Sequence, residues 1–489
     1  MSNLFCHQIV LTDKLLRSWI RCPRKAWLEC HGDHRQKNWN VHQRLQLDHQ
    51  QKSFAALIKT EPGIGIKACQ KGINGILGLK LTMKLANGDF LQSTPPLLQK
   101  ISGQSIWGNF SYRPVLARQG KKTTRELRQA LTLMTVLLEP MQKATVISAL
   151  SVSQTNNELE IEKININKKL RSQLINSLAK LKEDIQNDLA PPLISDRRKC
   201  SICAWQNFCN LEAKKQGHLS EISGIGMRRR EILVNLGIND IQDLAFSNPI
   251  LLNKELVKIN CHNQGLAEIL ITQAKVQLNG DPERINKMNA LPEVNLAEGV
   301  LIYDIESDSD AKEDFLHGFL SIRRKKDGQW DIDNAKYHPM VIIPEDSEGK
   351  KWKRIYKKIN NYSNWPILHY GETEAIAIKN LGKKQLIDKQ TMESIENRLI
   401  DIHERLTFHW VMPVSSYKLK NIAEWLGFNW KQSNPDGARA LLWWRQWKES
   451  SNKKKRKINS LKKIFIYNHD DCLATWHVAN WLLKQNQQL

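Results

Sequence analysis

Runs of apolar and polar positions divide the chain into four segments. Residues 1–215 open with a helical pattern and then contain Gly-rich, strand-like pieces before a cluster of cysteines. Residues 216–280 show short apolar stretches interrupted by glycines, which predicts a group of short helices. Residues 281–297 are polar and irregular, which indicates a linker. Residues 298–489 alternate between apolar strands and helices, which predicts an α/β sheet domain within an α/β multidomain protein.

The first strand of the last segment, Gly299–Glu306, is apolar but carries two acids, Asp304 and Glu306. Residues two apart on a strand project from the same face. Two neighbouring carboxylates repel each other and are costly to bury. A divalent cation removes that cost, and oxygen ligands suit Mg²⁺ or Mn²⁺. The strand therefore indicates a metal site, with a solvated strand end as the alternative.

A second acidic segment, Lys463–Cys472, is predicted to be a short strand that runs into a helix. Tyr467 and Asp471 are four residues apart, so a helical turn places them on one face. The carboxylate could then hold a metal while the phenol orients a water or a phosphate oxygen. The alternative is an ordinary helix N-terminus, where Asp470 and Asp471 favour the helix dipole.

Together the two segments resemble the DEDD exonucleases of the ribonuclease H-like superfamily, in the subtype with a tyrosine. The motifs are the Asp304-x-Glu306 strand and Tyr467-Asn-His-Asp-Asp-Cys-Leu-Ala-Thr475. Ile367-Leu-His-Tyr-Gly-Glu-Thr-Glu374, Pro413-Val-Ser-Ser-Tyr-Lys-Leu-Lys420 and Leu426-Gly-Phe-Asn-Trp430 fit the same family. The closest resemblance is to the predicted ribonuclease H-like domain that is fused to bacterial RecB-like nucleases.

The resemblance implies hydrolysis of phosphodiester bonds with two metal ions, in the 3′ to 5′ direction and on single-stranded ends. One ion would activate a water and the other would stabilise the leaving oxygen. Asp304, Glu306 and Asp471 match the metal-binding positions, and Tyr467 would help to position the water. The family's fourth acid is an aspartate, whereas the matching residue here is Glu374, so Asp401 is a second candidate.

Three cysteines, Cys200, Cys203 and Cys209, form a C-x2-C-x5-C arrangement. Such close thiols in a cytosolic protein indicate a bound ion or cluster, and Cys22 is the best distant fourth ligand. One N-terminal cysteine followed by three others resembles the iron–sulfur RecB-like nucleases, including those linked to CRISPR systems. That resemblance implies a [4Fe–4S] cluster that fastens the two ends of the domain, with structural zinc as the alternative.

The nuclease motifs of the RecB-like family are missing. That family needs an Asp after a Gly-rich strand and an acid-x-Lys pair on the next strand. Gly78-Leu-Lys-Leu-Thr-Met-Lys84 and Phe110-Ser-Tyr-Arg-Pro-Val-Leu-Ala-Arg118 occupy these places, and neither contains an acid. Residues 1–215 are therefore interpreted as a degenerate restriction-endonuclease-like domain that keeps its cluster. The alternative is that the motifs are misaligned and that this segment is the active nuclease.

Between the two larger segments, Gly224-Ile-Gly226 lies between apolar helical stretches and resembles a helix–hairpin–helix. Glycines at a helix N-terminus expose backbone N–H groups, which bind a phosphate without reading bases. Arg228 and Arg229, which follow at once, strengthen this interpretation. A helix–turn–helix with a purely packing role is the alternative.

The net charge of the chain indicates what kind of partner it binds. The chain has 73 Lys and Arg residues against 50 Asp and Glu residues, a formal net charge of +23. Such an excess indicates an acidic polymer, DNA or RNA, although phospholipid headgroups are an alternative. No apolar run approaches the roughly 20 residues of a membrane-spanning helix. The N-terminus lacks the features of a signal peptide, so we expect a cytoplasmic protein without a membrane partner.

Five tryptophans crowd one region of the last segment: Trp425, Trp430, Trp443, Trp444 and Trp447. They could stack on unpaired bases, but a Trp-rich helix is more often part of a core. The sequence as a whole predicts a nuclease with two Mg²⁺ or Mn²⁺ ions. The alternative function is a non-catalytic scaffold that binds nucleic acid and carries an iron–sulfur cluster.

Overall fold

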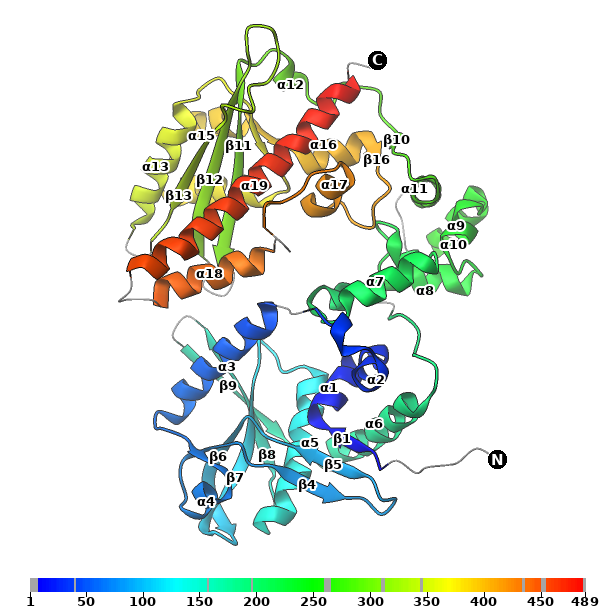
Figure 1. Cartoon of the computed structure of the whole chain (residues 1–489), viewed down its shortest axis with the longest axis vertical. Coiled ribbons are helices and arrows are strands. Elements are labelled where there is room, and N and C mark those ends of the chain that lie inside the picture. The colour runs from blue at the N-terminus through cyan, green and yellow to red at the C-terminus, as the bar shows by residue number, and fades with distance from the viewer. Residues whose placement is uncertain are drawn as a thin grey trace. The chain divides into compact units, whose positions relative to one another are not determined.

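The computed structural model divides the chain into two compact units, Met1–Glu212 and Ala213–Leu489 (Figure 1). The division lies next to the end expected for the first segment, residues 1–215. The structure describes residues 8–38, 41–155, 158–194, 197–258, 265–308, 313–343, 346–432, 436–449 and 454–486.

The first unit contains two sheets and several helices. Its strands are β1 (Val10–Thr12), β2 (Gly63–Ile64), β3 (Gly75–Leu77), β4 (Leu81–Lys84), β5 (Phe90–Ser93), β6 (Leu97–Ser105), β7 (Gly108–Ala117), β8 (Ser148–Thr155) and β9 (Glu158–Asn165). Its helices are α1 (Asp13–Arg21), α2 (Pro23–His31), η1 (His34–Gln36), α3 (Val41–Ile58), α4 (Gly65–Gln70), α5 (Arg125–Gln142), α6 (Lys168–Gln186), η2 (Arg197–Ile202) and α7 (Gln206–Lys215), which continues into the second unit.

The larger sheet has the strand order β2-β3-β6-β7-β8-β9, and the smaller has the order β1-β5-β4. Helix α5 packs between them because almost every turn carries apolar side chains, and Leu131, Leu133 and Leu138 are fully buried. The described chain opens with β1 rather than with the expected helix. Thr12 ends that strand and caps α1 by accepting a hydrogen bond from the Leu15 N–H.

Both stretches that lack RecB-type acids fall on strands of this unit. The stretch Gly78–Lys84 ends with β4. The stretch Phe110–Arg118 lies within β7, except for Arg118, which comes directly after it. Nearby acids have other partners, since Glu160 and Glu162 on β9 pair with Arg118 and Arg128. Within the part of this unit that the structure describes, no three acidic, histidine or cysteine side chains lie close enough to share one metal ion.

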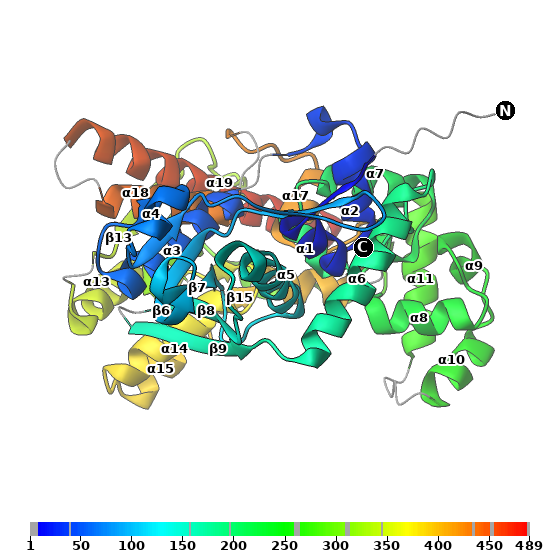
Figure 2. The same cartoon turned by 90° about the horizontal axis from the view of Figure 1, so that it is seen from below.

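The second unit begins with a cluster of short helices. These are η3 (Leu219–Glu221), α8 (Met227–Asn235), α9 (Ile241–Ala245), α10 (Pro249–Lys258) and α11 (Leu266–Asn279). They lie side by side in two perpendicular views (Figures 1 and 2), around a small core that includes Leu233, Leu244 and Leu270. The glycines that interrupt the sequence lie between these helices, as expected.

A five-stranded sheet forms the centre of the rest of this unit, with the order β13-β12-β11-β14-β15. Its strands are β11 (Gly299–Asp308), β12 (Glu313–Arg323), β13 (Lys336–Val341), β14 (Ile367–His369) and β15 (Leu399–Asp401); β10 (Glu283–Arg284) and β16 (Trp410–Val411) pair separately. The helices are α12 (Pro292–Asn295), α13 (Glu348–Asn360), α14 (Thr373–Lys384), α15 (Lys389–Glu396), α16 (Ile402–His409), α17 (Leu419–Trp425), α18 (Gly437–Glu449) and α19 (Lys454–Asn486).

Alternation along β11 divides the core into two layers. Leu301 and Tyr303 pack with apolar residues of α13, α14 and α15 on one face of the sheet. Val300 and Ile302 pack on the other face with residues of α16, α17 and α19. Because side chains alternate along a strand, Asp304 shares the face of Ile302, toward α19.

Two expectations about this unit are wrong. Residues 281–297 are not a free linker, because Leu291 and Val294 are fully buried in the core with α19. The stretch Lys463–Cys472 is not a strand that leads into a helix but lies within the single helix α19. Ile464 and Cys472 are both buried and lie about two helical turns apart, a spacing that suits one buried face of a helix. Asp470 and Asp471 therefore lie inside the helix and not at its N-terminus.

Of the five tryptophans, Trp444 meets the expectation of a core residue. It is 1% exposed and stacks on Phe315, with the ring centroids 4.9 Å apart. Trp425, by contrast, is more than one third exposed.

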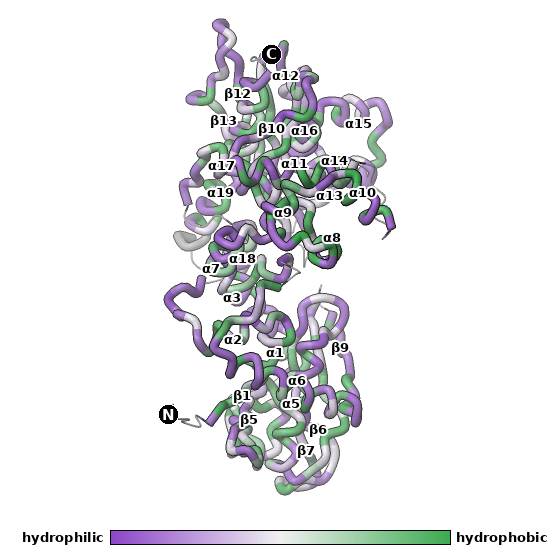
Figure 3. Tube along the Cα trace, turned by 90° about the vertical axis from the view of Figure 1, so that its right-hand side faces the viewer, coloured by the Kyte–Doolittle hydropathy of each residue, from purple (hydrophilic) through white to green (hydrophobic). Residues whose placement is uncertain are grey.

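Polar and apolar residues are interspersed along the coloured, described part of the trace (Figure 3). None of the described helices combines the length and the apolar character that crossing a membrane requires.

Candidate active site

Two acids project from the central strand of the second unit. Strand β11 pairs with β12 along its length, including at Asp304 and Glu306, and with β14 at Leu301 and Ile302. Glu306 is only 7% exposed and Asp304 is half-buried. Both carboxylates therefore lie largely away from water, where charge is expensive unless it is neutralised.

Helix α19 adds the third acid, Asp471, which is also half-buried. One carboxylate oxygen from each of Asp304, Glu306 and Asp471 lies within 4.8 Å of the other two. Three carboxylates at this spacing form a donor set of oxygens only, which suits a hard divalent cation such as Mg²⁺ or Mn²⁺. The residues therefore fit the metal that the sequence analysis expected.

Electrostatics explain why the three acids need a cation. Burial, and then repulsion from Asp471, raises the pKa of Asp304 well above its ordinary value. Burial and the Asp471 charge likewise raise the pKa of Glu306. Burial raises the pKa of Asp471 to about 7, although the Trp430 and Tyr467 hydrogen bonds partly oppose the shift. At neutral pH a metal-free cluster therefore holds protons that a cation would displace.

Asn468 orients Asp304 and was not expected from the sequence. Its Nδ2 donates to Asp304 Oδ2 at 2.5 Å, and its Oδ1 accepts from the Tyr337 hydroxyl at 2.7 Å. Asn468 is fully buried on α19 and faces Gly318 of β12. A Cβ on Gly318 would lie 1.6 Å from Asn468 Oδ1, so only glycine leaves room for this amide.

Asp471 is oriented by two aromatic residues. Trp430 Nε1 donates to Asp471 Oδ1 at 2.7 Å. The Tyr467 hydroxyl, one helical turn before Asp471, also forms a hydrogen bond with it. We expected Trp430 to be a core residue. Its position in the sequence, four residues after Leu426, did not indicate a hydrogen bond to Asp471. Sequence patterns could indicate the tyrosine because it shares a helix with Asp471, whereas Trp430 comes from a separate loop.

Glu374 and Asp401, the two candidates for a fourth acid, have different surroundings. Glu374 lies in the first turn of α14, is 4% exposed, and has a buried Oε2 without a hydrogen-bond partner. Burial raises its pKa to about 7, and its charge acts on Asp304. Asp401 instead caps α16, because its Oδ1 accepts from the backbone N–H groups of His403 and Gly371, each at 2.8 Å. Neither belongs to the close group of three.

The four cysteines expected to bind a cluster, Cys22, Cys200, Cys203 and Cys209, line one pocket of the first unit. Burial raises the pKa of Cys209 to about 11, while the Arg24 charge opposes that shift. Among the described residues, no three of these sulfur atoms lie within 4.8 Å of one another.

The glycine hairpin precedes α8 in the second unit. Gly224 has a φ of 85°, a conformation that favours glycine, and Gly226 is the N-cap of α8. Arg229 Nη1 donates to the Gly224 carbonyl at 2.6 Å, so this arginine closes the turn. Arg228 is exposed. The helix expected before the hairpin is only the short 3-10 turn η3, Leu219–Glu221.

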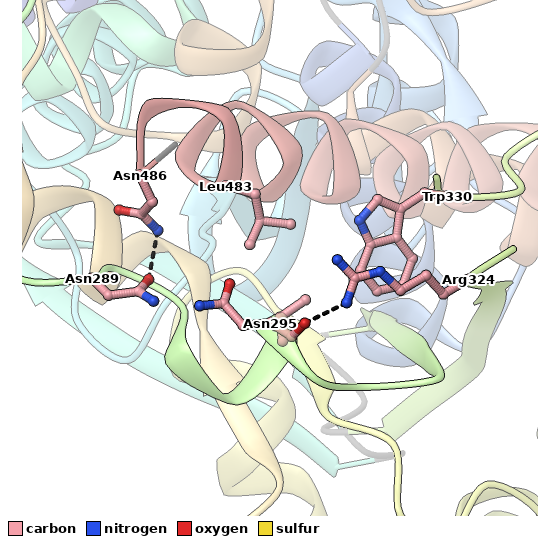
Figure 4. Close-up of a pocket in the computed structure, with 7 residues that line it drawn as sticks. Asn289, Asn295, Arg324, Trp330, Leu483 and Asn486 are labelled. Atoms are coloured by element: carbon pink, nitrogen blue, oxygen red, sulfur yellow. Dashed lines mark hydrogen bonds between the residues drawn. The ribbon is translucent and has the colours of Figure 1, made fainter. Parts of the chain in front are cut away.

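A small pocket near the end of α19 contains no acid (Figure 4). It has a volume of about 160 Å³ and is lined by Asn289, Asn295, Arg324, Trp330 and Asn486, among others. Asn486 Nδ2 donates to Asn289 Oδ1 at 2.6 Å, and the Arg324 guanidinium donates to the Asn295 carbonyl. These contacts attach residues 281–297 to α19 and to the residue that follows β12, so the pocket has a structural explanation.

Comparison with known proteins agrees with this geometry. Residues 301–483 match the model of a family described as the RNase H superfamily. The match begins in β11 and ends in α19, so it includes all three clustered acids. No curated protein matches the chain. The second unit therefore contains an RNase H-like domain, and this similarity suggests a nuclease-type function on nucleic acid.

The repulsion within the cluster predicts how the metal-free protein responds to pH. Asp471 and Glu374 have folded-state pKa values of about 7, above those of an unfolded chain. The folded state thus binds protons more tightly, and stability falls as pH rises from about 4 through 7. We expect thermal unfolding in EDTA to occur at a lower temperature at pH 8 than at pH 5, and Mn²⁺ to reverse the loss.

The control is Asp304→Asn, which removes one charge with little change in shape. Burial and repulsion raise the pKa of Asp304, so we expect this variant to be more stable than the wild type at pH 8 without metal. It should also respond less to Mn²⁺. If the wild type and Asp304→Asn are equally stable in EDTA at pH 8, repulsion among the acids does not destabilise the folded protein.

Proposed function

We propose that the second unit is a metal-dependent nuclease that hydrolyses phosphodiester bonds, as a 3′ to 5′ exonuclease on single-stranded nucleic acid. The observation that carries the proposal is the convergence of Asp304, Glu306 and Asp471 from β11 and α19. The direction and the preference for single strands rest on the resemblance of the motif residues to DEDD exonucleases.

Asp304, Glu306 and Asp471 would hold two Mg²⁺ or Mn²⁺ ions. When bound, the ions would activate a water and stabilise the leaving oxygen. Asn468 holds the Asp304 carboxylate, while Trp430 holds that of Asp471. Because the Tyr467 hydroxyl already bonds to Asp471, its role is to position this ligand and, from there, the attacking water.

Glu374 is the fourth acid in this proposal. Its burial, its unpartnered Oε2 and its electrostatic effect on Asp304 support the assignment. A cation would relieve the cost of burying that unpaired oxygen. Asp401 is a weaker candidate because its carboxylate already accepts backbone hydrogen bonds at the start of α16.

The first unit, in this proposal, is a degenerate RecB-like domain with a [4Fe–4S] cluster on Cys22, Cys200, Cys203 and Cys209. The four residues line one pocket, which supports a shared ion or cluster. Arg24 and Arg197 line the same pocket and would offset the negative charge of four thiolates.

The hairpin is proposed to bind a phosphate of the backbone without reading bases, through Gly224, Gly226, Arg228 and Arg229. The left-handed Gly224 and the exposed Arg228 support this role. The net charge of +23 is consistent with nucleic acid as the partner.

Asp304→Ala tests the reaction. Purified protein is incubated with end-labelled single strands in Mn²⁺, and products are resolved by length. A lost metal ligand removes several kcal/mol of transition-state stabilisation, so we expect cleavage to fall about 100-fold or more. The matched control is Asp333→Ala, an exposed aspartate elsewhere in the same unit.

Three results would contradict the proposal in different ways. If the wild type does not cut, the protein is the non-catalytic iron–sulfur scaffold. If Asp304→Ala cuts as fast as the wild type, the first unit carries the activity. If Asp333→Ala loses activity to the same extent, the effect comes from net charge rather than from the cluster.

Glu374→Gln and Asp401→Asn distinguish the two candidates for the fourth acid. We expect Glu374→Gln to weaken Mn²⁺ binding and to lower kcat about tenfold or more, since it removes one anionic ligand. Asp401→Asn should instead lower unfolding stability by about 0.5–2 kcal/mol, the usual effect of a lost helix cap. Mn²⁺ titration by calorimetry and thermal unfolding measure both effects, and the opposite pattern would exchange the two roles.

Cys203→Ser tests the cluster separately. We expect protein purified without oxygen to contain iron and sulfide and to absorb visible light, and the variant to lose both. Cys30→Ser is the control, because Cys30 is exposed and does not line the cysteine pocket. Zinc in place of iron in the wild type, or full iron content in Cys203→Ser, would rule out the assignment.

A further inference from the structure

A groove in the second unit connects the acids with the glycine hairpin. It has a volume of about 1040 Å³, and its lining includes Asp304 together with Ser223 and Gly224. Pockets for small ligands span roughly 300–1000 Å³, so this space is at the upper end of that range. Asp304 and the hairpin therefore share one space, although the sequence gave no reason to place them together.

The walls of the groove carry apolar side chains that water reaches. Ile269 of α11 is 57% exposed, and Ile285, which follows β10, is 53% exposed. Trp410 and Leu419 also line the space. Exposed apolar side chains are costly in isolation, but the faces of unpaired bases would cover them. In a duplex those faces are stacked and unavailable.

Aromatic and polar groups also line the groove. The Tyr370 and His403 rings both line the groove, with centroids 5.5 Å apart and planes at 71°. Tyr370 is fixed because its hydroxyl donates to the Tyr417 carbonyl at 2.6 Å. Such fixed rings offer surfaces on which a terminal base can stack. Lys418, which is exposed, supplies a cation for a phosphate.

Hydrogen bonds attach the helical cluster to the sheet domain along the groove. Gln273 of α11 donates through Nε2 to the Met412 carbonyl at 2.6 Å and accepts through Oε1 from the Tyr417 hydroxyl at 3.1 Å. Gln273 is 5% exposed, so these bonds are shielded from water. The distance between the acids and the hairpin is thereby set by the fold.

We infer that this groove binds a single strand of nucleic acid, with the reacting end at Asp304 and the backbone further along at Gly224. The inference rests on the proposed function, because it places the scissile phosphate at the acids. Arg229, held against the Gly224 carbonyl, brings a cation to the far end. Glu268 also lines the groove and would repel phosphates, so bases rather than phosphates face α11.

A length threshold follows from this arrangement. A short strand can reach Asp304 without reaching the hairpin, whereas a strand that extends to Gly224 also contacts further residues of the lining, which include Ile269. Affinity should therefore increase sharply once the strand spans the groove. Substitutions on the α11 wall should then affect long strands and leave short ones unchanged.

Ile269→Glu tests the inference in the full-length protein. Fluorescence anisotropy in EDTA measures binding of labelled oligothymidylate of about 3 and about 12 nucleotides, a span typical of single-strand sites. We expect the variant to bind the longer strand about tenfold more weakly and the shorter strand equally well. The matched control, Ile250→Glu, changes a 76% exposed residue of α10 outside the groove and should bind as the wild type does.

Two further arms identify the ligand. Oligouridylate of the same lengths shows whether RNA or DNA is preferred, and a blunt duplex should bind more weakly than either single strand. Equal weakening by Ile250→Glu and Ile269→Glu, no effect of Ile269→Glu, or duplex binding as tight as strand binding would each overturn the inference. Matching thermal unfolding of the two variants excludes misfolding as the cause.

Cleavage in Mn²⁺ separates this inference from the proposed function. If the protein cuts, Ile269→Glu should raise KM for the longer strand about tenfold and leave kcat unchanged, since the clustered acids lie on β11 and α19 and not on α11. Cleavage with an unchanged KM would contradict strand binding in the groove and would leave the proposed nuclease activity standing. If binding depends on the groove but no cleavage occurs, the proposed nuclease activity is contradicted and strand binding in the groove stands.

Discussion

Repulsion among three carboxylates that are buried or half-buried is the constraint on which the second unit depends. Asp304 and Glu306 cannot separate, because they lie two residues apart on β11, where both are paired with β12. Asp471 cannot move away from the other two acids, because its helix packs into the core through Cys472 and Val478. The fold thus concentrates negative charge where water is scarce, and only a cation or protons can neutralise it.

The surrounding residues make this arrangement tolerable. Asn468 and Trp430 supply neutral N–H donors to two of the carboxylates, which stabilise the charged forms without neutralising them. A lysine or arginine in either place would pair with the acid and compete with a metal. The choice of neutral donors therefore keeps the carboxylates available as ligands while still fixing their orientation.

The sequence predicted local features well and distant contacts poorly. The expected strand Gly299–Glu306 is β11, and the expected ribonuclease H-like domain is confirmed by the family match. Alternation along one strand is a local property, so it placed Asp304 and Glu306 on one face. The segment Lys463–Cys472 was assigned wrongly because its apolar residues fit both strand and helix periods, and tertiary packing decided between them.

Residues that act through contacts across the fold left little trace in the sequence. Trp430 lies in a loop, and nothing in its neighbourhood indicates a bond to Asp471 on α19. The supposed linker, residues 281–297, mixes polar and apolar residues without a regular period, yet Ala290, Leu291 and Val294 are buried in the core. Glu374 could be identified by its motif, but its unpartnered oxygen emerges only once Ile305 and α14 are placed around it.

The position of α19 has a consequence for the protein while it is being synthesised. Asp304 and Glu306 lie on β11 and leave the ribosome before Asp471 and Asn468, which lie on α19. A nascent chain that ends between these elements carries two of the acids without the third and has no complete cation site. The group of three carboxylates therefore forms only after α19 has been synthesised and has packed against β11.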